Sequence, residues 1–251
     1  MFALEGQFEV ALIRGRFGEA QEFLTHAMSL VEAFRIVSRE DSIAQRQAML
    51  AYARGERVKV ESFCATTLPK VRPKHDQDRL GQALPLCAMA TALGGNVADG
   101  ARLVEEAKAT VESLEPSNPR RETISRADAF VAYVTGDFPR CLRTAHEGAL
   151  GTEPLGMNGP SVELRVLAAL ARDAMGDSAG AREEIEAAKR RADRSVDPRS
   201  MFRVRSAAAI LSGDAARLET ELRATSTAGF IGIVDELRAL ARTPVARRKG
   251  P

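Results

Sequence analysis

The residues best suited to nucleophilic or metal chemistry in this sequence are three cysteines and three histidines. Cys141 and His146 are the closest such pair, but on a helix five residues turn them about 140° apart, so they cannot share one metal ion without distant ligands. His26 and His75 stand far from them, and no Gly-x-Ser-x-Gly, His-Glu-x-x-His or phosphate-loop motif is present. We expect Cys141 in the core, His146 at the surface, and neither a metal ion nor a cofactor.

Two acidic pairs, Glu105–Glu106 and Glu183–Glu184, raise the alternative of acid–base catalysis. Such catalysis needs two carboxyl groups on either side of a substrate bond. Each pair instead lies among lysines and arginines of a predicted helix, which is typical of a solvated helix face. The sequence therefore offers no catalytic residues, and we expect a protein that is not an enzyme.

The composition narrows the classes of partner. Of 251 residues, 45% are apolar and 28% charged, which can bury a core and keep a solvated surface. The net charge is +2, from 36 basic and 34 acidic residues, without the excess expected of a nucleic-acid binder. No stretch approaches the ~18 apolar residues of a membrane span. We expect neither nucleic acid nor membrane as a partner.

The cysteines bear on the compartment. They number three, are widely spaced, and include no Cys-x-x-Cys pair: Cys64, Cys87 and Cys141. An odd number without close spacing argues against a disulfide framework. At the N-terminus, Glu5 and Glu9 interrupt the apolar run that a signal peptide needs. These features predict a cytoplasmic protein in a reducing environment.

A helix-breaking turn recurs along the chain. The helices on either side of these turns must position any functional site. The turn sequences RGRFGEA, RGERVKV, GGNVADG, TGDFPRC, MGDSAGA and SGDAARL contain the reference glycines Gly15, Gly55, Gly95, Gly136, Gly176 and Gly213. Successive spacings are 40, 40, 41, 40 and 37 residues, a length typical of helical repeats. Glycine ends a helix because it tolerates positive φ, and four turns continue with an Asn or Asp suited to cap the next helix: Asn96, Asp137, Asp177 and Asp214.

Equivalent positions around these glycines carry small or apolar residues. Seven residues before the glycine, five of six units have a small residue, as in Ala88 and Ala169. Twelve after it, every unit has one: Ala27, Thr67, Ala107, Gly148, Ala188 and Thr225. Helices whose axes lie about 8–10 Å apart need small side chains where they cross. The pattern predicts stacked pairs of helices.

These residues resemble tetratricopeptide (TPR) repeats, most clearly in TGDFPRCL and RGRFGEAQEFL, although the unit is about 40 residues long instead of 34. The resemblance implies an all-α, right-handed solenoid of about six helix-turn-helix repeats. Long-repeat variants are similar to helical sensor regions of large bacterial LuxR-like regulators and of some kinases.

The expected helix pairs are 2–14 with 17–36, 41–54 with 57–69, 77–93 with 98–114, 120–135 with 138–149, 161–175 with 178–193, and 199–212 with 214–225. Pro85 should kink the fifth helix or delay its start. The segment AGFIGIVDELRALA, with apolar residues at helical spacing, should form a capping helix. The repeat domain is thus predicted over residues 1–243, followed by a flexible basic tail at 244–251.

The resemblance also implies a concave groove lined by the first helices, at three, six and ten residues before each glycine. In the central units these positions carry Tyr, Met and other adaptable residues suited to recognition: Gln45, Met49, Tyr52, Met89, Arg126, Phe130 and Tyr133. The alternative is that these side chains simply pack in the core. The Lys–Asn clamp of chaperone-binding domains is not present at these sites.

Two functions follow as expectations. The first is a non-catalytic scaffold or regulatory module that binds a peptide or partner helix in the groove. The alternative is a ligand-sensing helical domain of a bacterial transcriptional regulator or signalling kinase, with a small-molecule effector. Both place the site on the first helices of the central units.

Overall fold

The computed structural model describes residues 2–36, 39–111, 118–153, 156–195 and 197–243, and the predicted tail at 244–251 lies outside them. Over these residues the chain is entirely helical, without strands, as the sequence predicts. The helices are α1 (Phe2–Ile13), α2 (Phe17–Phe34), α3 (Glu40–Ala53), α4 (Arg57–Val71), α5 (Gln77–Leu93), α6 (Val97–Thr110), α7 (Pro119–Val134), α8 (Phe138–Thr152), α9 (Asn158–Ala174), α10 (Ser178–Ala192), α11 (Pro198–Ser212), α12 (Ala215–Thr227) and α13 (Ile231–Arg242), with a short 3₁₀ helix at Arg72–Lys74.

Each reference glycine lies at the turn between two helices. All six adopt a positive φ, between +68° and +93°, which residues with a side chain rarely adopt. The predicted caps also form, since Asn96, Asp137, Asp177 and Asp214 each accept a hydrogen bond from a backbone N–H three residues later. The turns thus end one helix and start the next.

The small residues lie where neighbouring helices touch. Ala27, Ala107 and Ala188, one per second helix of three pairs, are at most 3% exposed. The position seven residues before the glycine is buried in every pair, by Phe8, Ala48, Ala88, Ala129, Ala169 and Ser206. The spacing that the sequence analysis used is therefore the spacing of helix contacts in the fold.

The predicted helix bounds agree with the structure to within about four residues. Of the two effects expected of Pro85, a delayed start is contradicted, because α5 begins at Gln77 and continues through Pro85. A second proline, Pro69, lies inside α4, which ends two residues later at Val71.

The expectation of unpaired cysteines is wrong. Cys64 of α4 and Cys87 of α5 form a disulfide, with their Cα atoms 5.8 Å apart. The pair lies 23 residues apart in sequence, and the packing of consecutive helices brings it together. Cys141 is unpaired and buried, as expected. The inference of a reducing compartment loses the support that it drew from the cysteines.

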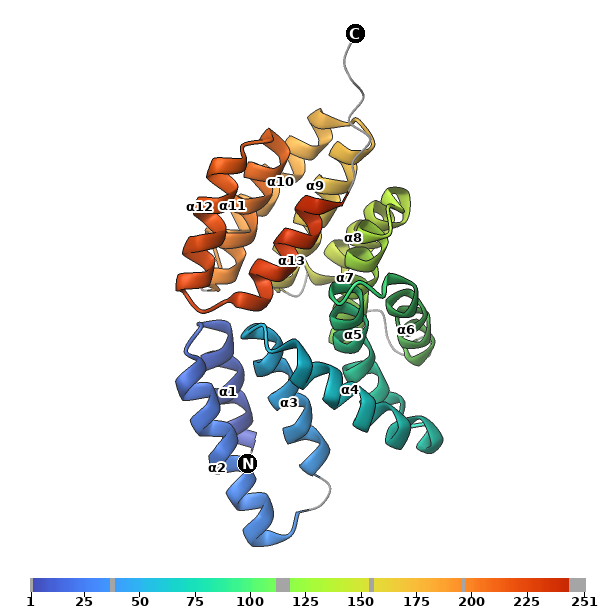
Figure 1. Ribbon diagram of the computed structural model, residues 1–251, viewed down its shortest axis with the longest axis vertical. Helices are drawn as coiled ribbons and strands as arrows, with labels where there is room; N and C mark the ends of the chain where they lie inside the picture. Colours follow the sequence, from blue (N-terminus) through green and yellow to red (C-terminus); the bar gives the residue numbers. More distant parts are fainter. Residues whose placement is uncertain (1, 37–38, 112–117, 154–155, 196, 244–251) are drawn as a thin grey trace.

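Helix α13 does more than cap the last pair. It contacts α11 and α12, but also α3, α5 and α7, and Figure 1 shows it in the middle of the molecule with the other helices around it. The turn before α13 reaches the N-terminal pair, where the ring centroids of Phe230 and Phe17 lie 5.3 Å apart, edge to face. The two ends of the helical array therefore meet through this turn.

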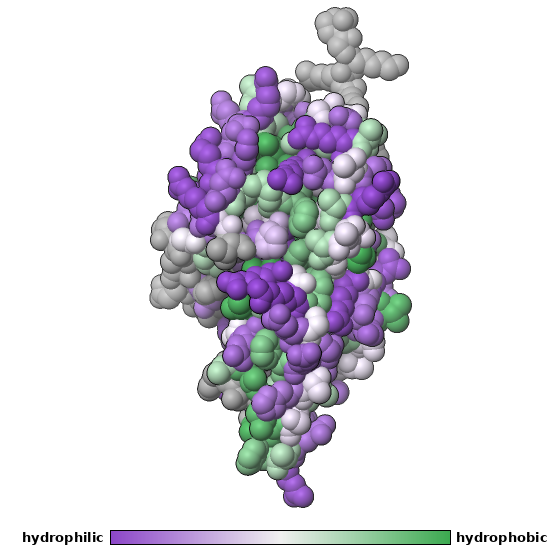
Figure 2. Space-filling model, turned by 90° about the vertical axis from the view of Figure 1, so that its left-hand side faces the viewer, coloured by the Kyte–Doolittle hydropathy of each residue, from purple (hydrophilic) through white to green (hydrophobic). Residues whose placement is uncertain are grey.

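The surface shows no helix suited to a bilayer. None of the helices in the described ranges is long and apolar enough to cross a membrane. On the face drawn in Figure 2, hydrophobic residues form separate patches between hydrophilic ones. Large exposed hydrophobic side chains are scattered over different helices, among them Phe34 of α2, Val58 of α4 and Leu150 of α8.

The packing of small residues can be tested by overfilling one helix crossing. Ala107→Phe should lower the free energy of unfolding by roughly 1–3 kcal/mol, because Ala107 is fully buried and the ring must displace its neighbours. The measurement is urea denaturation followed by circular dichroism. Ala109→Phe, at an exposed position of the same helix, is the control and should change little. Equal stability of the two variants would contradict the packing.

Candidate functional site

A single buried carboxylate is the centre of the candidate site. Glu236 of α13 is 2% exposed. Its Oε1 accepts hydrogen bonds from Tyr52 Oη and Arg126 Nη2, both at 2.8 Å. Its Oε2 accepts one from Arg203 Nη1 at 2.6 Å. Tyr52, Arg126 and Arg203 come from α3, α7 and α11, the first helices of three different pairs, and with Glu236 we call them the Glu236 cluster.

The spacing from the reference glycines positions these donors. Arg126 and Arg203 both stand ten residues before their reference glycines, Gly136 and Gly213, and Tyr52 stands three before Gly55. Helices α7 and α11 both begin with a capping Asn or Asp followed by proline, which sets the start of the helix and hence the direction of each arginine. We call the side of the array that faces α13 the inner side. Two of the three donors on it, Arg126 and Arg203, occupy equivalent positions in their helix pairs.

A second carboxylate balances the arginines. Glu163 of α9 forms an ion pair with Arg126 Nε, and its Oε1 lies 3.4 Å from Arg203 Nε. Burial alone would raise the pKa of Glu236, but the charges of Arg126 and Arg203, with hydrogen bonds from Arg203 and Tyr52, outweigh it and lower that pKa. Glu236 is thus ionised at neutral pH, and two arginines face two carboxylates, of which Arg203 and Glu236 are buried and Arg126 and Glu163 are partly buried.

The pKa values of Tyr52 and Glu122 are raised, in contrast to that of Glu236, and burial is the largest cause for both residues. Burial and the nearby negative charge of Glu236 raise the pKa of Tyr52 well above 10, which keeps its hydroxyl proton available to donate. Glu122, one helical turn before Arg126, has its pKa raised to about 7, mainly by burial and then by the charge of Glu163, against the opposing effect of Arg126. The site therefore contains one carboxyl group that titrates near neutral pH.

A cavity of about 270 Å³ lies beside the cluster, between α13 and the inner side. Its wall is mostly apolar, with Leu12, Met49, Leu86, Met89 and Ile233. Its polar residues include Tyr52, Arg126, Arg203 and Glu236 of the cluster, together with Gln45, Gln82, Arg120, Thr123 and Arg199. An apolar wall with a few convergent polar groups is typical of a binding site.

The structure brings five of the seven predicted groove residues together. Gln45, Met49, Tyr52, Met89 and Arg126 all line this cavity. Phe130 and Tyr133 do not; each is 1% exposed and packs in the largest hydrophobic core, where the Tyr133 ring meets Phe138 edge to face. The alternative of core packing thus holds for these two residues.

The ion pairs around Glu236 involve three residues that were not predicted as site residues: Arg203, Glu163 and Glu236. Arg203 occupies the same register position as Arg126 and could have been found by applying the register to the sixth pair. Glu163 and Glu236 had no such signal, because Glu163 lies off that register and α13 follows the last reference glycine. Their roles depend on where α9 and α13 pack.

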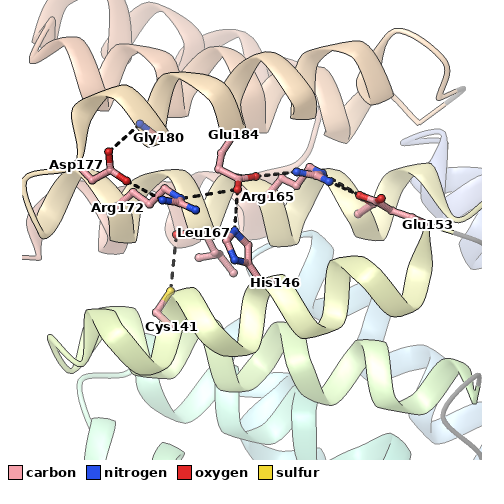
Figure 3. A network of polar contacts seen from close by, with 10 residues as sticks. Cys141, His146, Glu153, Arg165, Leu167, Arg172, Asp177, Gly180 and Glu184 are labelled. Atoms are coloured by element: carbon pink, nitrogen blue, oxygen red, sulfur yellow. Dashed lines mark hydrogen bonds and ion pairs between the residues drawn. The ribbon is translucent and has the colours of Figure 1, made fainter.

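A second ionic network joins α8, α9 and α10 (Figure 3). Glu184 is 8% exposed, which corrects its assignment to a solvated face. His146 Nε2 lies 2.7 Å from Glu184 Oε1, and Arg165 Nη1 lies 2.8 Å from its other oxygen. Arg165 also forms an ion pair with Glu153. Because basic groups surround each of these carboxylates, the network ties neighbouring pairs together instead of presenting a free acid–base pair.

The other acidic pair is also neutralised. Glu105 pairs with Lys108 and Arg140, and Glu106 accepts two hydrogen bonds of 2.7 Å from Arg72. Within the described residues, no group of three or more His, Cys, Asp or Glu side chains is arranged to hold a metal ion.

Comparison with known proteins adds no assignment. No protein-family model matches the chain, and no curated protein matches it at a significant level. The function must therefore be argued from the residues and their geometry.

Removing the central charge should destabilise the fold. Glu236→Gln leaves Arg126 and Arg203 buried with one carboxylate between them, and breaking a buried ion pair in this way costs about 3–5 kcal/mol. Urea denaturation at pH 7 measures the loss. The exposed Glu219→Gln on α12 is the control, with an expected change below about 0.5 kcal/mol. A loss for Glu236→Gln no larger than that of the control would contradict the cluster.

The raised pKa of Glu122 predicts that the free energy of unfolding depends on pH. Its folded-state pKa of about 7 exceeds its ordinary value of 4.5, so the stability linked to its protonation is present below 4.5 and is lost as the pH rises through 7. Glu122→Gln should therefore unfold at about the wild-type urea concentration at pH 4, yet be more stable by about 1–3 kcal/mol at pH 8. Glu186→Gln, exposed on α10, should show no such pH-dependent gain. Equal gains at both pH values would refute the assignment.

Proposed function

We propose that this chain is a non-catalytic interaction module of the TPR-like, long-repeat type, whose inner side is a concave groove that binds a peptide or partner helix. The supporting architecture is the recurrence of paired helices at glycine turns with small residues at their crossings. In this proposal the pairs stack as a right-handed solenoid of six units, a form that commonly offers an extended concave binding surface.

The observation that carries the proposal is the Glu236 cluster. Side chains from three separate first helices converge on one carboxylate of a helix that runs along the groove. Helix-in-groove recognition uses this combination of apolar anchors and a few fixed polar contacts. The inner side already contacts one helix in this way, and this contact supports the proposal.

A library selection tests this function. Peptides selected for binding to the full chain should bind on the inner side, so Met49→Glu should weaken them at least tenfold by placing a charge on the apolar wall. Val58→Glu is the control, because Val58 is 75% exposed on α4 and away from this cavity. Fluorescence anisotropy gives the affinities. Peptides that bind Met49→Glu as tightly as the wild type would place the binding surface elsewhere.

A second function, the sensing of a small effector, is favoured by the cavity of about 270 Å³. A ligand in that cavity would touch both α13 and the inner side, so its binding would report on their contact. A compound found by thermal-shift screening should lose its stabilising effect in Met89→Trp, where the larger ring fills the cavity, and keep it in Val58→Trp. Loss of the effect in both variants, or in neither, would argue against this site.

A further inference from the structure

We propose that the partner of the inner side is an amphipathic helix built like α13, with a glycine one turn before a glutamate and apolar residues beside them, and that α13 is the internal occupant which this partner replaces. The inference rests on the proposed function and names the chemistry of its partner. Five observations on α13 and its surroundings support it.

The first observation is the position of Gly232. Gly232 and Glu236 are four residues apart and therefore lie on the same face of α13. A Cβ atom at Gly232 would collide with the backbone oxygen of Tyr52. Tyr52 thus meets both residues, its carbonyl facing Gly232 and its hydroxyl donating to Glu236. An occupant must have no side chain at the first position and a carboxylate at the second.

The second observation is the apolar stripe next to that face. Phe230, Ile233, Val234, Leu237 and Leu240 are each at most 5% exposed. Their spacing of three and four residues is that of one helix face. Ile233 and Leu237 directly flank the glycine and the glutamate in sequence, so the recognised segment reads Gly-Ile-Val-Asp-Glu-Leu over 232–237.

The third observation is charge balance. With α13 in place, Arg126 and Arg203 face Glu163 and Glu236, and the four charges cancel. Without α13, Glu163 is the one carboxylate of the described residues that remains within ion-pair distance of the two arginines. A partner helix that brings no carboxylate leaves a buried cation uncompensated, which is strongly unfavourable. The inner side therefore selects an acidic partner helix over a neutral or basic one.

The fourth observation is that α13 is packed incompletely. The cavity of about 270 Å³ lies on one side of it, and a second cavity of about 210 Å³, lined by Tyr52, Gly55, Arg57, Leu93 and residues of α13, lies on another. Unfilled space lowers the number of contacts that are lost when the helix leaves. A partner that fills these cavities would gain contacts that α13 does not make.

The fifth observation is the tether. Only the turn at 228–230 joins α13 to α12. Its Gly229 has a φ of +88° and lies so close to Phe17 that a Cβ atom there would collide with the ring. A short turn with a glycine is suited to act as a hinge. Rotation there moves α13 without unfolding α11 or α12, so exchange of the occupant does not require global unfolding.

The test uses a fluorescent peptide with the sequence of residues 228–243 and the full chain. Two chain variants weaken the internal occupant: Gly232→Leu, which blocks its close approach to Tyr52, and Glu236→Gln, which removes its charge. Anisotropy should show at least tenfold tighter peptide binding to each variant than to the wild type, with Glu219→Gln unchanged from it. Circular dichroism checks that the variants are folded.

Peptide variants test the recognition code. A peptide with Glu236→Gln should bind the Gly232→Leu chain at least tenfold more weakly, whereas the matched Asp235→Asn peptide, which loses the same charge one residue away, should change less than threefold. Equal binding of the Gln peptide and the unmodified peptide would overturn the proposal.

If a variant fails to fold, the proposal can still be tested on the wild-type chain. At saturating peptide, hydrogen exchange of the α13 amides should rise at least fivefold while that of α9 stays constant. No rise overturns the proposal. A dimer seen by light scattering that the peptide does not dissociate would also overturn it, because the occupant would then be α13 of a second copy. Library peptides that depend on Met49 but lack the glycine–glutamate pair would refute this partner and leave the proposed function standing.

Discussion

The buried carboxylate of Glu236 is the contact on which the arrangement of the inner side depends. Removing a charge from water is costly, and the cost is offset here because Arg126, Arg203 and Tyr52 bind both carboxylate oxygens. These three donors come from pairs that are distant in sequence. One side chain of α13 therefore links the second, fourth and sixth helix pairs, and its loss would leave two arginines buried with a single anion.

Apolar packing supports this contact from outside. Alanine, glycine and other small residues let the helices of successive pairs approach closely, and the curved array that results directs the first helices towards α13 (Figure 1). Phe230 closes the array by packing between Phe17 of the N-terminal pair and Phe202 of the sixth. The ionic network around Glu184 and the disulfide between Cys64 and Cys87 add links between neighbouring pairs. The frame is thus held by contacts between adjacent pairs, whereas the interior is held by α13.

This division suggests how the molecule can respond to a partner. Contacts between adjacent pairs do not involve α13, and under our proposal they hold the frame when a partner replaces that helix. The two cavities beside α13 and the glycine turn before it support this exchange, whereas the Glu236 cluster opposes it and must be re-formed by the carboxylate of the partner. Binding of the partner helix and displacement of α13 would then occur together on the inner side.

Local rules explain how much the sequence determined by itself. Glycines with positive φ, capping Asn and Asp residues, and small residues at a period of about 40 act within one or two helices, so they predicted the helices and their bounds. The resemblance to TPR repeats, through the register before each glycine, predicted one groove for Gln45, Met49, Tyr52, Met89 and Arg126, and these five residues line a single cavity in the structure. Phe130 and Tyr133 share that register but lie in the core, because helix packing and not the period decides how deep each position is buried. The disulfide and the place of α13 were decided only by the tertiary structure. Cys64 and Cys87 become neighbours through the packing of α4 on α5, and Glu236 finds its partners 184, 110 and 33 residues away. Contacts of this range depend on how all the helix pairs pack together, and no single pair of helices encodes that arrangement.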